Sequence, residues 1–235
     1  MRKKTHKEIF IGKIAEYFKN CGIISASSDL NLESLEKFYF LYTELIEWNK
    51  KINITAITDE SEFIKRHILD SAFLFKVLDK GEGYIMDIGS GAGFPGIVLN
   101  ILNPALNIVS VESIFKKCNF QKNISRKLNL VNFNCLNLNI FSYKNFNENL
   151  DAVTTRAAFN VNELINLIEK LNFKKSIDLY LFLTNLNEAK KIADFKYKAK
   201  LIRLDRILFY KTDYSDFKNA KNGLRLIAKY TAAPK

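Results

Sequence analysis

Four glycines lie within eight residues of the segment DIGSGAGFPG (residues 87–96), in a chain that holds only nine glycines. Glycine lowers stability unless the backbone needs a positive φ or a ligand must approach closely, so this spacing predicts a ligand-binding loop. Gly89, Gly91 and Gly93 follow the G-x-G-x-G spacing of methyltransferases that use S-adenosylmethionine. Gly91, Gly93 and Gly96 also fit the G-x-G-x-x-G fingerprint of dinucleotide-binding loops. The glycines therefore leave two adenosine-containing cofactors open, S-adenosylmethionine and NAD.

Acidic residues end the two strands that we expect beside this glycine loop (residues 89–96). Asp87 lies at the end of a short apolar strand, and Glu112 ends the alternating segment 106–111. In an open α/β sheet, ligands bind beyond the carboxyl ends of the strands, where the strand order reverses. A carboxylate at Glu112 can accept hydrogen bonds from both ribose hydroxyls of an adenosine, which both cofactors contain. The acid before the loop and the short region after Glu112 favour S-adenosylmethionine.

The methyl acceptor is narrowed by motifs that the sequence lacks. Methylation of an exocyclic amine usually comes with an Asn/Asp-Pro-Pro-aromatic motif, and cytosine C5 methylation often uses a cysteine after proline; neither pattern occurs. An acceptor with its own lone pair remains, and guanine N7 is such an atom. It loses no proton, so the reaction needs no general base. Holding N7 in line with the methyl group and sulfur supplies the catalysis.

The charge and composition favour a nucleic-acid partner. The net charge is +11, from 36 basic and 25 acidic residues, and such a surface attracts polyanions. A chain rich in Lys, Asn and Ile also arises from AT-rich coding bias, so the charge alone does not decide. The three cysteines are widely spaced and predict neither a disulfide framework nor a metal site. No apolar run is long enough to span a bilayer, and we expect a cytoplasmic monomer.

The hydrophobic pattern predicts the elements that position these residues. Residues 1–80 form three helices, which begin after Thr5, after Asp29 or Asn31, and after Thr58 or Asp59. From residue 81 onward, strands alternate with helices at 95–102, 114–128 and 161–171; the expected strands are 84–88, 106–111, 131–136, 151–155, 177–183, 201–208 and 224–228. This order predicts a mostly parallel α/β sheet with helices on both faces. We expect an N-terminal helical region (1–80) and a Rossmann-like domain (81–235) that form one compact unit.

A set of motifs resembles a known family. The segments WNKKINITAIT (48–58) and RHILDS (66–71) precede the glycine loop, and VES (111–113), KK (116–117) and VTTRA (153–157) follow it. In this order they resemble the bacterial small-subunit (16S) ribosomal RNA guanine-N7 methyltransferase family RsmG, or glucose-inhibited division protein B, over residues 45–171. The resemblance implies a Rossmann-like fold, S-adenosylmethionine as cofactor and ribosomal RNA or the small ribosomal subunit as partner. The alternatives are an NAD-dependent oxidoreductase and a non-catalytic basic RNA-binding assembly factor.

The same resemblance implies cofactor contacts outside the glycines. They fall at Phe94 in the loop, at Glu112, and at Arg156 just past the fourth strand. The family also uses two residues after the third strand, often Ala-Glu, which correspond to Ile140 and Phe141 here. Because the acid is missing, a contact there is expected through the backbone. The chain also departs from the family in its last third, where LFLTN (181–185) replaces a usual Lys-Gly.

Three residues upstream of the loop are candidates for substrate positioning. Arg66 and His67 are interpreted either as contacts to RNA phosphate or the target base, or, for His67, as a helix-packing residue bonded to Asp70. Asn53, with Thr55, either lines the site or caps a loop by side-chain to backbone bonds. No residue is predicted to act as a catalytic base.

Overall fold

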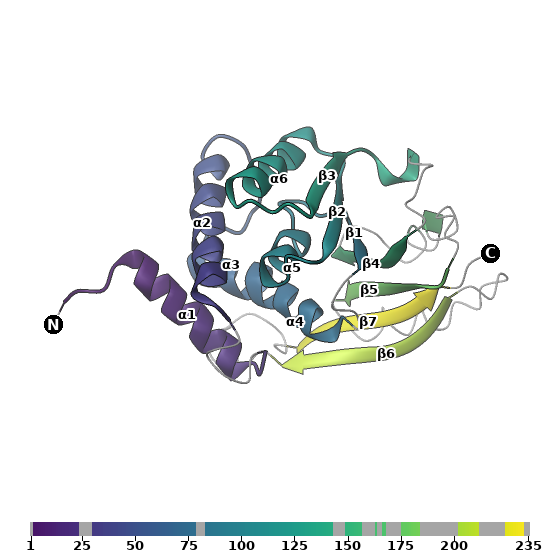
Figure 1. The fold of residues 1–235 in the computed structure, drawn as a ribbon, viewed down its shortest axis with the longest axis horizontal. Helices are drawn as coiled ribbons and strands as arrows, with labels where there is room; N and C mark the ends of the chain where they lie inside the picture. The colour runs from purple at the N-terminus through teal and green to yellow at the C-terminus, as the bar shows by residue number, and fades with distance from the viewer. Residues whose placement is uncertain are drawn as a thin grey trace.

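Seven strands form one mixed sheet, with helices packed against it (Figure 1). The computed structural model describes residues 2–23, 30–78, 83–142, 149–156, 163, 166–167, 175–183, 202–211 and 224–232, with only the backbone of 202–211 and 224–225. The strands are β1 (Tyr84–Ile88), β2 (Asn107–Glu112), β3 (Phe133–Asn137), β4 (Leu150–Arg156), β5 (Ile177–Leu183), β6 (Ile202–Lys211) and β7 (Leu224–Ala232). Each expected strand is present, with ends shifted by a few residues.

The strand order is β3-β2-β1-β4-β5-β7-β6. Strands β1 to β5 are parallel, and β7 is antiparallel to both of its neighbours, β5 and β6. The chain runs outward from β1 through β2 to β3 and then returns to the other side of β1 at β4, so the order reverses between β1 and β4. The expected α/β sheet is therefore confirmed, and the glycine loop leaves β1 at the reversal point.

The N-terminal helices begin at the capping residues that the sequence predicts. They are α1 (His6–Asn20), α2 (Leu32–Asn49), α3 (Glu60–Phe63), a π-helix η1 (Ile64–Leu69) and α4 (Asp70–Val77). The side chains of Thr5, Asn31 and Asp59 each accept a hydrogen bond from a backbone N–H of the first turn. The alternative cap Asp29 lies outside the described residues.

One prediction about the core of α2 is wrong. The helical spacing in the sequence puts Leu32 on the apolar face of this helix, with Leu35, Tyr39, Tyr42, Leu45 and Ile46. In the structure Leu32 is 63% exposed. It is the first residue of α2, and the buried stripe begins only at Leu35 and continues through Phe38, Leu41 and Leu45. The helical period correctly gives the direction of the stripe, but it does not show how far along the helix the neighbouring elements reach.

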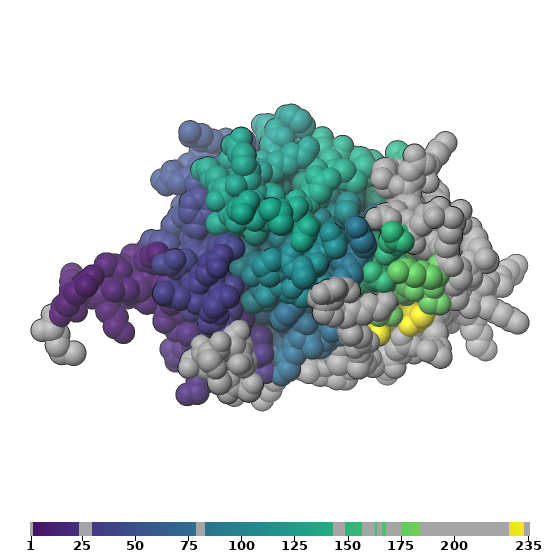
Figure 2. Space-filling view, viewed as in Figure 1, coloured from purple at the N-terminus to yellow at the C-terminus, as the bar shows by residue number. Residues whose placement is uncertain are grey.

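One face of the sheet is covered by the N-terminal helices and by the two helices that follow β1 and β2. A single hydrophobic cluster joins residues of α1 to α4 with α5 (Gly96–Leu102), α6 (Phe115–Lys127) and alternate strand residues such as Ile85 and Ile108. Figure 2 shows the purple and blue N-terminal residues in continuous contact with the teal residues that follow them in the sequence. Because this core does not divide near residue 80, we propose that residues 1–80 and 81–235 form one compact unit.

The opposite face of the sheet carries a second cluster. Met86, Ile88 and Val111, which alternate with the first set along their strands, pack there with Leu167. Residues 163, 166 and 167 are helical and belong to the helix expected at 161–171. The remainder of that helix lies outside the described residues.

Candidate functional site

The glycine loop has a backbone that other residues adopt only with strain. Gly89, Gly91 and Gly93 have φ angles of +69°, +60° and +93°. A Cβ on Gly93 would lie 2.4 Å from Cδ1 of Ile97, so this position also lets the loop pack against α5. A Cβ on Gly91 would meet no atom within 4 Å. The loop therefore leaves open space beside Gly91, where a ligand can approach the backbone.

Glu112 ties this loop to the end of β2. Its Oε2 accepts a hydrogen bond from the N–H of Gly91 at 2.8 Å, and its Oε1 accepts one from the N–H of Ile114 at 2.7 Å. The residue is 5% exposed. A carboxylate has about four lone-pair directions, so each oxygen can still accept a hydroxyl hydrogen. The expected meeting of Glu112 with the glycine loop is present.

A pocket of about 180 Å³ lies at the carboxyl ends of the strands. Ile88 and Gly89 form one wall, Val111 and Ser113 form the next, and the segment after β3 closes it; its lining residues there are Leu138, Asn139, Ile140 and Phe141. Ile140 and Phe141 lie in a short 3-10 helix, η2 (Ile140–Ser142). The Asn139 side chain accepts a hydrogen bond from the N–H of Phe141 at 3.0 Å. The walls are mainly apolar, and Glu112 stands between two lining residues, which suits a nucleoside.

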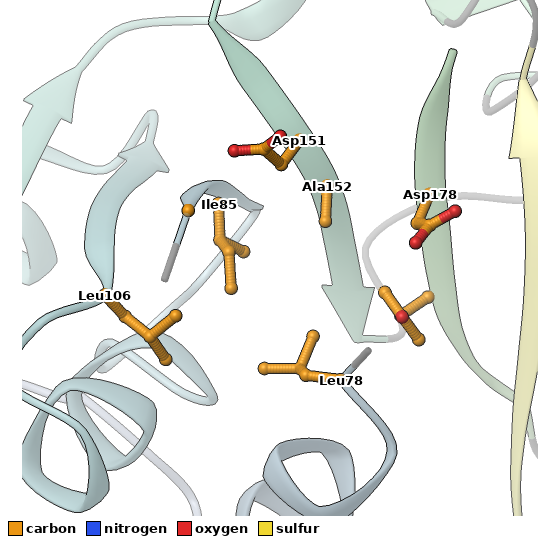
Figure 3. A pocket seen from close by; sticks show the side chains of 8 residues that line it. Leu78, Ile85, Leu106, Asp151, Ala152 and Asp178 are labelled. Carbon is orange, nitrogen blue, oxygen red and sulfur yellow. The ribbon is translucent and has the colours of Figure 1, made fainter. Parts of the chain in front are cut away.

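A second pocket lies at the amino ends of the strands (Figure 3). Asp151 and Asp178 line it together with Leu78, Ile85 and Leu106. Its volume of about 10 Å³ has room for about one water molecule. Lys175 pairs with Asp151 at 2.7 Å and Lys229 with Asp178 at 3.1 Å. This small, charge-compensated space cannot receive a nucleoside.

Phe94, at the end of the loop, is held in a buried aromatic cluster. The ring of His67 stacks on it, with centroids 4.1 Å apart and an interplanar angle of 5°. Phe63 meets Phe94 edge to face at 5.9 Å. The guanidinium of Arg156 lies over the Phe94 ring, 5.9 Å from its centroid. Residues from α3, η1 and β4 thus fix one side of the loop.

His67 connects Arg156 to this cluster. Arg156 donates a hydrogen bond to Nδ1 of His67 at 2.9 Å and another to the carbonyl of Arg66. Because a guanidinium only donates, Nδ1 carries a lone pair, and the proton of the neutral ring is on Nε2, 3.5 Å from the Thr55 hydroxyl. Burial, with the charges of Arg156 and Arg66, lowers the pKa of His67 well below its usual value. His67 is therefore a neutral, buried acceptor.

Asp87 anchors the start of α5. Its Oδ2 accepts a hydrogen bond from the N–H of Gly96 at 2.8 Å, and its other oxygen is buried without a partner among the described residues. Burial is the main cause that raises the pKa of Asp87 to about 7, against the lowering effects of the Gly96 N–H and Arg156. The carboxyl is placed behind the loop rather than in the pocket.

Of the substrate-positioning candidates, His67 and Arg66 lie at the Phe94 cluster, and Asn53 is two residues from Thr55, which approaches His67. Arg66 is partly exposed and pairs with Glu62 at 2.7 Å. Asn53 is exposed in the segment between α2 and α3. That segment is organised by Asn49, whose side-chain Oδ1 accepts hydrogen bonds from the N–H groups of Ile54 and Thr55. The motif around residue 53 therefore has a structural role. The sequence did not single out Asn49 for it.

A family model described as rRNA small subunit methyltransferase G (GidB) matches residues 33–211, more than half of the chain. The chain belongs to this family.

Relatives named "Ribosomal RNA small subunit methyltransferase G" agree with this. The protein of Lachnoclostridium phytofermentans is 38% identical over 150 residues, which cover 62% of this chain and 62% of that protein. The protein of Clostridium tetani is 31% identical over 221 residues, which cover 89% and 90%. A solved SAM dependent methyltransferase from Aquifex aeolicus has a TM-score of 0.54 at 16% identity, covering 74% of this chain and 94% of that one. The last comparison supports the Rossmann-like methyltransferase fold alone.

The family motifs occupy one region of this structure. The loop glycines, Glu112 and the pair Ile140–Phe141 surround or adjoin the 180 Å³ pocket. Phe94 and Arg156 lie in the aromatic cluster on the other side of the loop. The family segment RHILDS contributes His67 to that cluster.

No helix in the described part of the chain meets the length and apolarity needed to cross a membrane. In the same part, no group of three or more His, Cys, Asp or Glu residues is placed to hold a metal ion.

Proposed function

We propose that the protein is an S-adenosylmethionine-dependent methyltransferase that modifies N7 of a guanine in small-subunit (16S) ribosomal RNA. The observation that carries this proposal is the positive-φ glycine loop held by Glu112 beside a pocket at the strand reversal point. Family membership supports methyl transfer over the NAD-dependent alternative. The guanine N7 assignment rests on the family resemblance and on the chemistry of the site described below.

The residues around the pocket fit the cofactor. Glu112 retains lone pairs for the ribose hydroxyls, and the space beside Gly91, which a side chain would fill, admits the ligand to the backbone. Gly89 and Gly93 shape the loop, Ile140 and Phe141 bound the nucleoside end of the pocket, and Phe94 and Arg156 hold the loop from the opposite side. Bound there, S-adenosylmethionine supplies a methyl group on a positively charged sulfur.

The side chains near the loop favour an acceptor that loses no proton. His67 is neutral, but its Nδ1 is occupied by Arg156 and its Nε2 carries the proton. Asp87 is fully buried behind the loop. Neither group can reach a substrate as a base, since His67 is held in the Phe94 cluster and Asp87 is buried against the Gly96 N–H. Guanine N7 attacks with its own lone pair, so positioning suffices.

We propose that the protein binds ribosomal RNA or the small ribosomal subunit. We also propose that it acts as a cytoplasmic monomer. The net charge of +11 supports electrostatic attraction to RNA. Arg66 and Asn53, both exposed, are the proposed contacts that position the substrate.

The test combines binding and mapping. S-adenosylmethionine is expected to raise the melting temperature of the protein, since a ligand that binds the native state stabilises it, whereas NAD is expected to leave it unchanged. Small subunits from a strain that lacks the gene are then incubated with protein and cofactor, and N7-methylguanine is mapped by borohydride and aniline cleavage. Stabilisation by NAD alone would restore the oxidoreductase alternative. Cofactor binding without a new N7-methylguanine would contradict the substrate assignment and favour a non-catalytic assembly factor.

A further inference from the structure

Three polar side chains form a buried cluster directly behind the glycine loop. Gln121 of α6 and Ser110 of β2 are fully buried, and Ser90 of the loop is nearly so. The Ser110 hydroxyl lies 2.6 Å from both the Ser90 hydroxyl and Oε1 of Gln121. Nε2 of Gln121 lies 2.8 Å from the Ser90 hydroxyl and 2.8 Å from the carbonyl oxygen of Gly91. Gln121 lies outside the segments of this chain that resemble the family motifs.

The donors and acceptors of this cluster fit one arrangement. The Gly91 carbonyl can only accept, so the Gln121 amide must turn its NH₂ group toward it. That group gives one hydrogen to Gly91 and the other to Ser90. Ser110 must then donate to Oε1 of Gln121, which leaves the Ser90 hydroxyl to donate to Ser110. Each hydroxyl donates once, and every polar atom of the ring has a partner.

This ring and Glu112 hold the same residue from two directions. Glu112 accepts from the N–H of Gly91, and Gln121 donates to its carbonyl oxygen. Both peptide groups of Gly91 are therefore fixed, while the space beside its Cα is open. A satisfied buried network is rigid and specifies one geometry. Apolar packing at the same place would lack such directional bonds.

We propose that Gln121 is a positioning residue, which acts with Ser90 and Ser110 to hold the glycine loop in its cofactor-binding conformation. The inference rests on the proposed function, because it concerns the affinity of that loop for S-adenosylmethionine. Gln121 touches Ser90, Ser110 and Gly91 and orders the backbone that faces the cofactor. This network orders the glycine loop before the cofactor binds, so less conformational entropy is lost on binding.

The main test is Gln121→Met, which keeps the length of the side chain but removes both donors. Its matched control is Asn100→Leu, since buried Asn100 of α5 also donates its amide to a backbone carbonyl, that of Leu106, at the amino end of β2. S-adenosylmethionine affinity is measured by titration calorimetry, and melting temperature by circular dichroism. We expect Gln121→Met to weaken binding at least about tenfold, in line with one lost buried hydrogen bond. Asn100→Leu should lower the melting temperature and leave the affinity within about twofold of wild type.

A double-mutant cycle tests whether the ring acts as a unit. Ser90→Ala removes one member with a small change in volume, and it serves alone if Gln121→Met does not fold. We expect Ser90→Ala to weaken binding in the wild-type background and to have little further effect beside Gln121→Met, because coupled residues are not additive. Wild-type affinity in the folded single variants, or additive losses in the double variant, would overturn the proposal. A wild-type protein that does not bind S-adenosylmethionine would instead refute the proposed function.

Discussion

Glu112→Gln is the sharpest test of how the cofactor loop is held. Each carboxylate oxygen of Glu112 accepts one backbone N–H, from Gly91 at 2.8 Å and from Ile114 at 2.7 Å. A glutamine of the same shape offers one acceptor and one NH₂ group, so one of the two backbone N–H groups would face a donor. The substitution therefore removes one charge-assisted hydrogen bond and weakens the other.

The expected loss follows from these bonds. Hydrogen bonds to charged groups contribute about 1.5–3 kcal/mol, and the lost contact to the loop or to the ribose lowers affinity by about 10- to 150-fold. Glu112 is 5% exposed, so water cannot readily replace the missing acceptor. Glu112→Asp should bind weakly as well, because the shorter side chain cannot reach both N–H groups in their present positions.

Calorimetric titration with S-adenosylmethionine measures the effect, and urea unfolding shows whether the variant remains folded. Glu44→Gln is the matched control, since it removes the same charge at the contact between α2 and α6, where Glu44 pairs with Lys127 at 2.7 Å. The control should bind normally. If folded Glu112→Gln binds within about twofold of wild type, Glu112 neither organises the loop nor contacts the ribose.

The remaining predictions concern the glycine loop, the two groups with shifted pKa values (His67 and Asp87) and the binding of RNA. Gly91→Val should abolish S-adenosylmethionine binding in calorimetry with the fold retained by circular dichroism, because the new side chain enters the open space at a φ of +60°; normal affinity would remove Gly91 from the site. The saturating single-turnover rate should stay nearly flat from about pH 6 to pH 9, since His67 is already neutral there. His67→Asn should weaken cofactor or RNA binding without changing that profile, and a tenfold rise per pH unit lost in the variant would make His67 a base. The native pKa of Asp87 lies near 7, above its unfolded value of 3.8, so the native state binds the extra proton and this group's contribution to unfolding free energy falls as pH rises from about 4 to 7. Asp87→Asn should be more stable than wild type at pH 8 in urea titrations, and lower stability there would contradict the assignment. RNA affinity by filter binding should fall at least about tenfold between 50 and 200 mM salt, whereas a flat response would mean that the +11 charge has no role in binding.

Local patterns in the sequence predict the elements well because local forces set them. Thr5, Asn31 and Asp59 are capping residues whose bonds reach only three residues ahead. The order of the sheet is different, because the antiparallel insertion of β7 between β5 and β6 depends on pairing between distant segments. Leu32 shows the same limit on a smaller scale, since its exposure depends on where neighbouring helices end.

In the candidate site too, some residues can be predicted from the sequence and others only from the fold. The glycine spacing and Glu112 could be interpreted because backbone conformation and ribose binding impose residue types at fixed positions. Gln121 carries no such signal, since a buried amide can serve many backbone groups and only the fold selects Gly91. Asn49 lies within a family segment, but its bonds to the backbone near Thr55 are seen only in the structure. Arg156 and His67 are 89 residues apart in sequence. Their contact joins β4 to η1, and no local pattern shows it.

That contact links the electrostatics of the site to the proposed chemistry. Burial, with the charge of Arg156, keeps His67 neutral. Arg156 also occupies Nδ1 of His67, while the stacked Phe94 ring shields the imidazole from solvent. An amine acceptor would need a base that can take up its proton, and His67 can do this only by releasing Arg156. An acceptor such as guanine N7 makes no such demand. It requires a rigid loop, and the bonds of Glu112 and Gln121 to Gly91 provide that rigidity from opposite ends of one residue. The site therefore supports catalysis through fixed geometry rather than proton transfer.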